Sequence, residues 1–350
     1  MGLDELRRQI KHNCDISDAR FWGYYSICGM LMRIRQLYRQ EHALMPWDSI
    51  PNDLILPWIS EQEAKWEQLE DEQFGNISID GIELPPFEVE KINSILTPNG
   101  LLYGAGFGMH RKPTFFLGKL LHIATIDGCT AYYIDGELER DLFASPAMLQ
   151  GNNIYIRLQP LYDFVYDKIS TLQGRRHDSI IADTFGDIRL KNPNTDNFRK
   201  RFEALSLNVS QILLLHEAAE YAEDSSKWLE LLGGITDRFV EIYLRAAKDL
   251  LADTSINGPL RHIIDTQDKT LLAFYTILLD NVRKEVFPEI STAYEKFASG
   301  SSDWQSIEQA RTTGYSRAMQ FRQEILTLWE NQHSIGEINS YIKQFIKNIL

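Results

Sequence analysis

The spacing of the apolar residues changes near residue 159, and this change constrains the fold more than any other feature. Between Gly75 and Leu158 they form short runs rich in branched and aromatic side chains, separated by turns such as Asp80-Gly81, which is typical of β-strands. From Gln159 onward they recur three and four residues apart, as in amphipathic helices. The sequence therefore predicts an α+β protein: N-terminal helices plus a mainly antiparallel sheet, followed by an all-α C-terminal helical bundle.

The first half is expected to contain helices and then strands. A short helix over Leu3–His12 precedes a long one to about His42, for which Asp15, Ser17 and Asp18 are N-cap candidates. Prolines 46, 51 and 57 interrupt the pattern before a helix over Glu61–Leu69. A hairpin forms around Asp80-Gly81, and further strands are expected at Leu101–Phe107, Thr114–Thr125, Cys129–Ile134 and Asn153–Leu158. The connections are too short for helical crossovers, which favours antiparallel pairing.

The second half is expected to be a bundle with short connections. Its predicted helices cover Leu161–Leu172, Phe198–Leu205, Val209–Tyr221, Lys227–Ala252, Leu260–Val286, Ser302–Trp329 and Ile335–Ile349. A polar stretch at Pro193-Asn194 suggests a boundary between an α+β domain (1–193) and a helical-bundle domain (194–350). A chain of 350 residues is long enough for two domains.

Composition limits the classes of partner. The net charge of −13 disfavours broad nucleic-acid binding. The apolar runs are too short to span a membrane, and no secretory signal opens the sequence. Three widely spaced cysteines suit a reducing compartment, so we expect a cytoplasmic protein.

Several motifs together resemble an uncharacterised bacterial family known as a pair of domains of unknown function. They are Asn13-Cys14-Asp15-Ile16-Ser17-Asp18-Ala19-Arg20, residues 100–106 (GLLYGAG), residues 112–118 (KPTFFLG), Arg140-Asp141-Leu142 and Pro146-Ala147-Met148. A looser match surrounds Leu215-His216-Glu217. The resemblance implies a two-domain layout and cytoplasmic residence, and it implies no activity.

A glycine-rich segment is the first candidate for chemistry. Gly104 and Gly106 are followed by His110, Arg111 and Lys112. Glycines allow close backbone approach and the cations could hold a phosphate or carboxylate. A strand follows instead of a helix, so this is not a dinucleotide-binding loop. The alternative is a hairpin connection whose glycines satisfy the turn.

A His-Glu helix is the second candidate. His216 and Glu220 are four residues apart and share a helix face, so both could ligate one metal ion, with Glu217 beside them. Later helices supply Asp249, Asp253 and His262, and the ion would be Fe, Mn or Zn. The alternative is that these groups form solvated faces and surface salt bridges, such as Arg245 with Asp249.

Two further segments have competing interpretations. Cys14 lies among charged residues and could be a nucleophile, whereas the alternative is a capping segment with Cys14 buried. Arg33, Arg35 and Arg39 could bind single-stranded nucleic acid, whereas the alternative is neutralisation by the acidic segment 51–72.

Two functions therefore stay open. One is a non-catalytic binding or scaffold protein that self-associates or binds a protein partner through its helical half. The other is a metal-dependent enzyme or metal-binding protein with its site in the bundle.

Overall fold

The chain divides into two compact units. The structure is a computed structural model that describes residues 2–108, 111–172, 193, 195–223, 226–279, 281–301 and 303–349. Unit 1 comprises Met1–Asp167 and unit 2 comprises Lys168–Leu350. The boundary proposed at residues 193 and 194 adjoins residues outside these ranges and stays a prediction. No described helix is both long and apolar enough to cross a membrane.

Unit 1 opens with helices whose bounds differ from the predicted ones. They are α1 (Leu3–Phe21), the short 3-10 helix η1 (Trp22–Tyr24), α2 (Ile27–Glu41) and α3 (Asn52–Leu69). The expectation of a helix start near Asp15 was wrong, because α1 continues through that segment. The chain breaks after Phe21 instead, where the Ser26 side chain accepts a hydrogen bond from the backbone amide of Gly29 and starts α2. The helix α3 starts before Pro57 and contains it.

The predicted hairpin is confirmed by β1 (Ile77–Ile79) and β2 (Ile82–Leu84), which pair antiparallel. Asp80 and Gly81 both have positive φ angles, 51° and 88°, as a tight two-residue turn requires. The short helices α4 (Val89–Leu96) and η2 (Thr97–Asn99) then lead into the main sheet.

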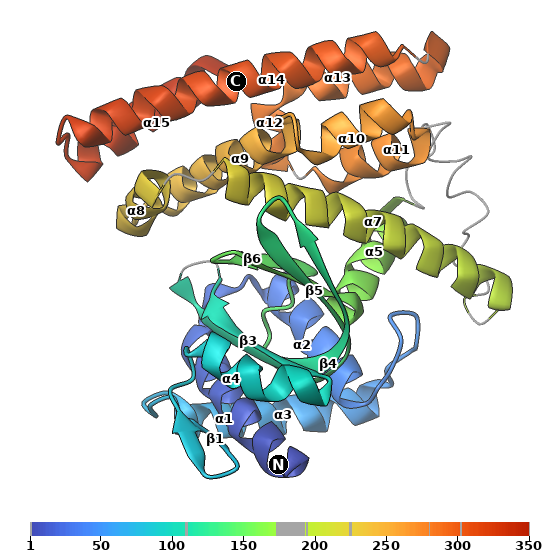
Figure 1. The fold of residues 1–350 in the computed structure, drawn as a ribbon, viewed down its shortest axis with the longest axis vertical. Helices are drawn as coiled ribbons and strands as arrows, with labels where there is room; N and C mark the ends of the chain where they lie inside the picture. Colours follow the sequence, from blue (N-terminus) through green and yellow to red (C-terminus); the bar gives the residue numbers. More distant parts are fainter. Residues whose placement is uncertain are drawn as a thin grey trace. The chain divides into compact units, whose positions relative to one another are not determined.

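The main sheet has five strands in the order β3-β4-β5-β7-β6 (Figure 1). The strands are β3 (Leu101–Phe107), β4 (Pro113–Ile126), β5 (Cys129–Arg140), β6 (Ala147–Gln150) and β7 (Asn153–Arg157). Pairing is antiparallel except between β5 and β7. The sequence did not predict β6, which forms a hairpin with β7 and leaves β7 parallel to β5. The mainly antiparallel sheet is confirmed.

The core of unit 1 lies between this sheet and the first helix. Helix α1 packs against β4 and β5, and α4 packs against β3. Leu6 and Ile10 of α1 are buried with Phe115 and Leu117 of β4. Because successive side chains of a strand point to opposite faces, Phe116 packs on the other face, with Tyr155 of β7.

Unit 2 is helical, as predicted. Its described elements are α7 (Asp196–Ala222), α8 (Ser226–Gly234), α9 (Arg238–Thr254), α10 (Pro259–Thr266), α11 (Lys269–Leu278), α12 (Asn281–Val286), α13 (Pro288–Lys296), the π-helix η4 (Phe297–Ser301), α14 (Trp304–Glu330) and α15 (Ile335–Ile349). Helix α5 (Leu158–Leu172) crosses the boundary between the units. The helix predicted over residues 260–286 is three helices, because Gln267 adopts a left-handed conformation and Asp268 caps α11.

Helix α9 is central in unit 2, because it packs against both α7 and α14 (Figure 1). Its apolar face contributes Leu250 and Leu251 to one core cluster and Val240 and Leu244 to another. This packing holds α7 and α9 side by side, with polar residues of both helices facing each other.

Candidate metal centre

The polar contact between α7 and α9 brings together four of the residues predicted from sequence. His216 and Glu220 are one turn apart on α7, and Asp249 and Asp253 are one turn apart on α9. Because residues four apart share a helix face, each helix presents a pair to the other. The side chains of His216, Glu220 and Asp249 are 13, 18 and 16 % exposed, so solvent still reaches them.

Three ligand atoms converge at this contact. The His216 Nε2 atom lies 3.7 Å from Glu220 Oε2 and 4.0 Å from Asp249 Oδ1. One ligand atom from each of the three residues can be chosen so that all lie within 4.8 Å of one another. Atoms about 2.1 Å from a tetrahedral ion lie about 3.4 Å apart. The group is thus slightly more open than a filled site, and small side-chain rotations would close it.

The imidazole of His216 is held in one orientation through its Nδ1 atom, on the side away from Glu220 and Asp249. Its Nδ1 donates a hydrogen bond to Asp253 Oδ1 at 2.7 Å, and Asp253 Oδ2 accepts one from the Tyr275 hydroxyl at 2.9 Å. A carboxylate that holds one ring nitrogen of a histidine directs the other nitrogen toward a metal ion. Here the directed atom is Nε2, the atom that faces Glu220 and Asp249.

Two cations bind the outer oxygens of the carboxylates. Lys248 pairs with Glu220 Oε1, and Arg283 Nη2 lies 2.5 Å from Asp249 Oδ2. The second oxygen of each carboxylate, Glu220 Oε2 and Asp249 Oδ1, faces His216 Nε2. The cations therefore orient both carboxylates and leave one oxygen of each toward the imidazole.

The electrostatics of the cluster follow from its burial and its crowding. Burial alone would lower the pKa of His216, but the Asp253 carboxylate and its hydrogen bond raise it to about 10. Burial, with Glu220 nearby, raises the pKa of Glu217 to about 7. Without an ion, His216 is therefore charged and pairs with the carboxylates, and a metal ion would have to displace its proton.

The remaining predicted residues stand apart from the three converging atoms. His262 lies on α10, where its Nε2 is 3.2 Å from Nε2 of Gln211. Glu217 lies on α7 next to His216 and affects the site through its charge. The prediction of a surface salt bridge between Arg245 and Asp249 was wrong. Arg245 pairs instead with Glu241 at 2.8 Å, one turn earlier on α9. Asp249 pairs with Arg283, which α12 brings to the site.

Sequence reasoning missed three contributors, namely Lys248, Tyr275 and Arg283. Lys248 was detectable, since it stands beside Asp249 and follows Glu241 and Arg245 in a charged pattern on α9. Tyr275 and Arg283 come from α11 and α12, and their spacing along the chain carries no signal that relates them to His216.

The glycine-rich segment of unit 1 forms a strand and not a loop. Gly104 and Gly106 lie in β3, opposite Phe116 and Thr114 of β4. A Cβ atom on Gly104 would lie 2.1 Å from the Phe116 ring, which explains the glycine. The prediction that Gly104 and Gly106 form an anion-binding loop was therefore wrong, because both lie within a strand.

The cations after these glycines have different surroundings. Lys112 is 3 % exposed, and its Nζ lies 3.1 Å from Asp18 Oδ1 and 3.4 Å from Asp141 Oδ2. Arg111 is exposed, and His110 lies outside the described residues. Lys112 thus neutralises buried carboxylates, and the structure gives no support to an anion site at Gly104, Gly106, Arg111 and Lys112.

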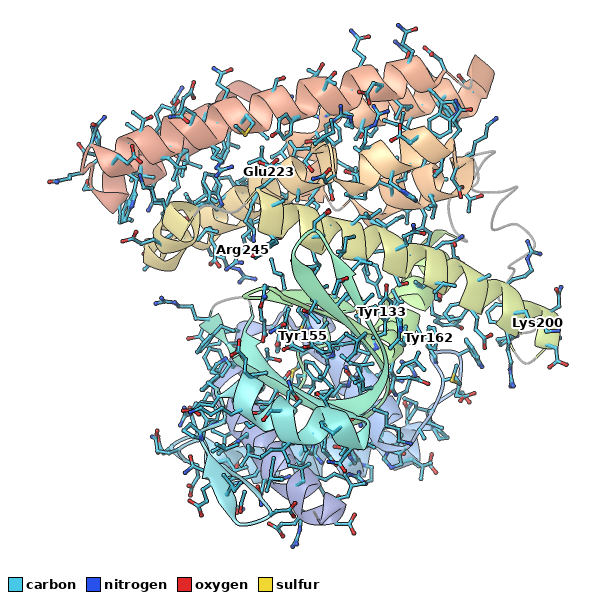
Figure 2. The ribbon with its side chains drawn as sticks, in the orientation of Figure 1. Tyr133, Tyr155, Tyr162, Lys200, Glu223 and Arg245 are labelled. Atoms are coloured by element: carbon cyan, nitrogen blue, oxygen red, sulfur yellow. The ribbon has the colours of Figure 1, made fainter. Side chains whose placement is uncertain are left out.

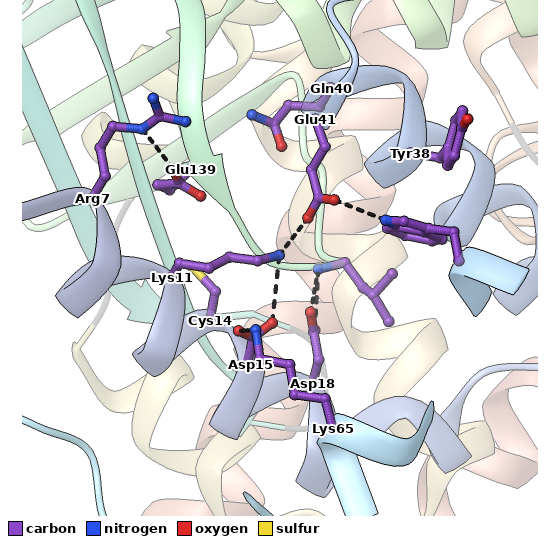
Figure 3. A network of polar contacts seen from close by, with 12 residues as sticks. Arg7, Lys11, Cys14, Asp15, Asp18, Tyr38, Gln40, Glu41, Lys65 and Glu139 are labelled. Carbon is purple, nitrogen blue, oxygen red and sulfur yellow. Dashed lines mark hydrogen bonds and ion pairs between the residues drawn. The ribbon is translucent and has the colours of Figure 1, made fainter. Parts of the chain in front are cut away.

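The segment from Asn13 to Arg20 lies within α1 (Figure 3). The expected caps were therefore wrong, whereas the predicted burial of Cys14 is confirmed. Asp15 pairs with Lys11 and Lys65, and both oxygens of Asp18 accept from the Leu142 amide at 3.0 Å. Lys65 and Leu142 come from distant segments, which is why local sequence suggested caps instead.

The thiol of Cys14 is buried in the core of unit 1. Its Sγ lies 3.4 Å from the Phe115 carbonyl oxygen. Burial raises the pKa of Cys14 well above its usual value, and Asp141 adds to the effect. The thiolate is therefore disfavoured, and the nucleophile hypothesis loses its physical basis.

Arg33 finds a different partner from the expected acidic segment. Its Nη1 donates to the Leu142 carbonyl at 3.2 Å, and its guanidinium lies 4.6 Å from the centre of the Tyr25 ring. These contacts within unit 1 occupy one of the three arginines predicted as candidates for nucleic-acid binding.

Comparison with known proteins supplies a family and no activity. The model of the family of unknown function DUF6866, N-terminal domain, matches residues 5–157, and the model of its C-terminal domain matches residues 162–348. Neither a curated protein nor a solved structure matches the chain. The resemblance to a family with paired domains of unknown function is thus confirmed, and the chain belongs to the DUF6866 family.

Proposed function

We propose that this protein binds a divalent metal ion in unit 2 through His216 Nε2, Glu220 Oε2 and Asp249 Oδ1. One imidazole and two carboxylates form a ligand set that suits Zn, Mn or Fe. Three protein ligands leave a position for water, and a metal-bound water is the nucleophile of metal-dependent hydrolysis. A metal-dependent enzyme is therefore the class of function that this arrangement favours.

One observation carries the proposal: each of the three side chains is fixed by a partner on its far side. Asp253 holds His216, Lys248 holds Glu220 and Arg283 holds Asp249. Exposed ion pairs contribute little stability by themselves, so the salt bridges alone do not explain why the three side chains converge. Here the remaining atoms of all three residues point at one place, as supported ligands do.

The test is the metal content of the purified, tag-free protein. We expect close to one equivalent of Zn, Mn or Fe, and its loss in His216→Ala. The matched control is His262→Ala, which removes a histidine of the same unit outside the site and should keep the ion.

Two results would contradict the proposal. The first is a metal content below about a tenth of an equivalent in the purified protein, combined with an unchanged melting temperature when metal is added. The added Zn, Mn or Fe(II) must be at concentrations that would saturate a functional site. The other is an ion that remains bound after His216→Ala, which would place it elsewhere.

Cytoplasmic residence belongs to the proposal as well. All three cysteines are free, and the Cys28 side chain is exposed. An exposed thiol of this kind is typical of a reducing compartment.

A further inference from the structure

Unit 1 contains a cavity that is independent of the metal centre. Its volume is about 350 Å³, at the lower end of the range of about 300–1,000 Å³ for small-molecule sites. Three parts of unit 1 form it: the first turn of α4, the strand β3 at Ala105, and the hairpin of β6 and β7. Its lining includes Phe87, Glu90, Lys91, Gln150 and Tyr155.

Tyr155 contributes a hydroxyl group to the cavity wall. The residue is 1 % exposed, and its ring packs against Phe116 and Tyr132. Among the described residues, none forms a hydrogen bond with its hydroxyl. Burial raises the pKa of Tyr155, with Tyr132 and Glu90 adding to the effect, so the hydroxyl keeps its proton. Because Tyr155 lines the cavity, its hydroxyl can form a hydrogen bond with a molecule that binds there.

Gln150 contributes a second donor. Its Nε2 atom is buried and has no hydrogen-bond partner in the described part of the chain. The amide lies directly over Gly106, where a Cβ atom would come within 2.0 Å of Nε2. Glycine at position 106 therefore leaves room for this amide at the cavity wall, a role that turn geometry does not explain.

The charges at the cavity disfavour ionic ligands. Glu88 pairs with Lys91 at 2.5 Å, which leaves the exposed Glu90 carboxylate as the net charge of this wall. An anion would be repelled by Glu90, and a metal cation would leave the Gln150 Nε2 donor without an acceptor. A hydroxyl group both donates and accepts, so it satisfies the carboxylate and the donors alike.

An aromatic face completes the site. Phe87 lines the cavity and stacks on Phe107, with ring centres 5.2 Å apart and planes 8° from parallel. Phe87 is 40 % exposed and Phe107 is 64 % exposed. The exposed part of the Phe87 ring offers apolar contact to the C–H bonds of a polyhydroxylated ring.

We propose that this cavity binds a small, uncharged polyhydroxyl molecule of the monosaccharide class, with Tyr155 and Gln150 as donors, Glu90 as acceptor and Phe87 as the stacking surface. This site goes beyond the proposed metal function and rests on different residues in the other unit.

The test is a titration of the full-length protein with glucose, galactose, mannose, ribose and N-acetylglucosamine, followed by ligand-observed NMR and calorimetry. At least one sugar should bind saturably. Tyr155→Phe removes the hydroxyl and keeps the ring, and Gln150→Glu replaces the donor amide by a carboxylate. Each should weaken binding about two- to tenfold, as expected for one lost hydrogen bond.

The matched control is Tyr133→Phe. Tyr133 lies on β5 and pairs in register with Ile156 of β7 (Figure 2). The preceding residue, Tyr132, stacks on Tyr155. Because successive side chains of a strand point to opposite faces, the side chain of Tyr133 points away from Tyr155. This variant should bind as the unchanged protein does. The proposal is overturned if no sugar binds at about 50 mM, or if Tyr155→Phe and Gln150→Glu both bind with unchanged affinity. Tighter binding of inorganic phosphate or spermidine at the same residues would also overturn it.

Discussion

Both units bury clusters of opposite charges, but the two clusters are connected differently. In unit 1, Asp141 accepts from the amides of Phe115 and Phe143, at 2.9 and 2.7 Å, and Asp18 accepts from the amide of Leu142. Lys112 then lies against both carboxylates. In unit 2, Glu220 and Asp249 each use one oxygen for a cation and turn the other toward His216.

The comparison teaches how a buried charge can serve the fold or a ligand. Asp18 and Asp141 are completely buried and bonded by backbone groups, so they tie α1 to the sheet. Lys112 also donates a hydrogen bond to the Ser17 hydroxyl at 2.8 Å, and both side chains are buried. Burial alone would lower the pKa of Lys112, but the neighbouring carboxylates of Asp141 and Asp18 raise it. A charged, buried lysine cannot accept a proton from a serine hydroxyl as a general base would. The contact between Lys112 and Ser17 is therefore structural.

The largest expected effect is on the cluster in unit 1. Lys112→Ala leaves two buried carboxylates without their cation and should lower the free energy of unfolding by about 3–5 kcal/mol. Urea denaturation measures it. Arg111→Ala, at the exposed neighbouring position, should cost less than about 0.5 kcal/mol. Equal, small effects of the two variants would mean that Lys112 does not hold the cluster.

The second effect concerns the cluster in unit 2. Saturating metal at about a hundred times its dissociation constant should stabilise the protein by about 2.7 kcal/mol. Asp253→Asn keeps the shape of the side chain but weakens the support of His216, so metal affinity should fall about 10- to 100-fold. Competition with a chelator measures this affinity. An unchanged affinity would show that Asp253 does not position the ligand.

The third effect is a pH dependence specific to unit 1. Burial, with Asp141 nearby and against the lowering effect of Lys112, raises the pKa of Asp18 from 3.8 to about 7. The folded state thus binds this proton more tightly than the unfolded state does. The resulting stabilisation is fully present below about pH 4 and is lost as the pH rises through about 7. Hydrogen exchange of α1 should therefore become faster over this range.

The control for the pH dependence is Asp18→Asn, which cannot ionise. Its α1 exchange, corrected for the intrinsic rate, should depend less on pH between 4 and 7 than that of the unchanged protein. Identical slopes for both proteins would assign the effect to other groups.

The smallest effect is expected at a pair on α9 outside both clusters. Arg245 and Glu241 form a partly exposed contact one turn apart, and Arg245→Ala should change the free energy of unfolding by about 0.5 kcal/mol or less. Metal affinity should stay the same. A clear loss of metal affinity would extend the centre beyond the residues described above.

Elements with strong local signals were predictable. Asp80-Gly81 specified the hairpin, and the helical period after residue 159 specified the helical character of unit 2. Helix ends were less predictable, because Ser26 and Asp268 act as caps only where the chain turns. The strand β6 was missed, since four residues with a mixed pattern acquire their pairing from β7.

The candidate site was predictable within one helix and not between helices. The spacing of His216 and Glu220 by itself places them on one face. The other contacts of the site depend on how α7, α9, α11 and α12 pack. This packing brings Asp249 to that face, places Asp253 and Tyr275 behind His216, and brings Arg283 to Asp249. Likewise, Asp15 and Asp18 looked like caps because their lysine partners, Lys65 and Lys112, are distant in sequence.

The sequence by itself determined periodicity, turn chemistry and charge, since these depend on neighbours within a few residues. It thereby determined the α+β and helical halves and named His216 and Glu220. Only the tertiary structure decided which polar groups are buried together, and so which carboxylates hold the fold in unit 1 and which turn toward a shared position in unit 2. The physical reason is that burial and long-range pairing set the energy of a charge, and both arise only when distant segments pack.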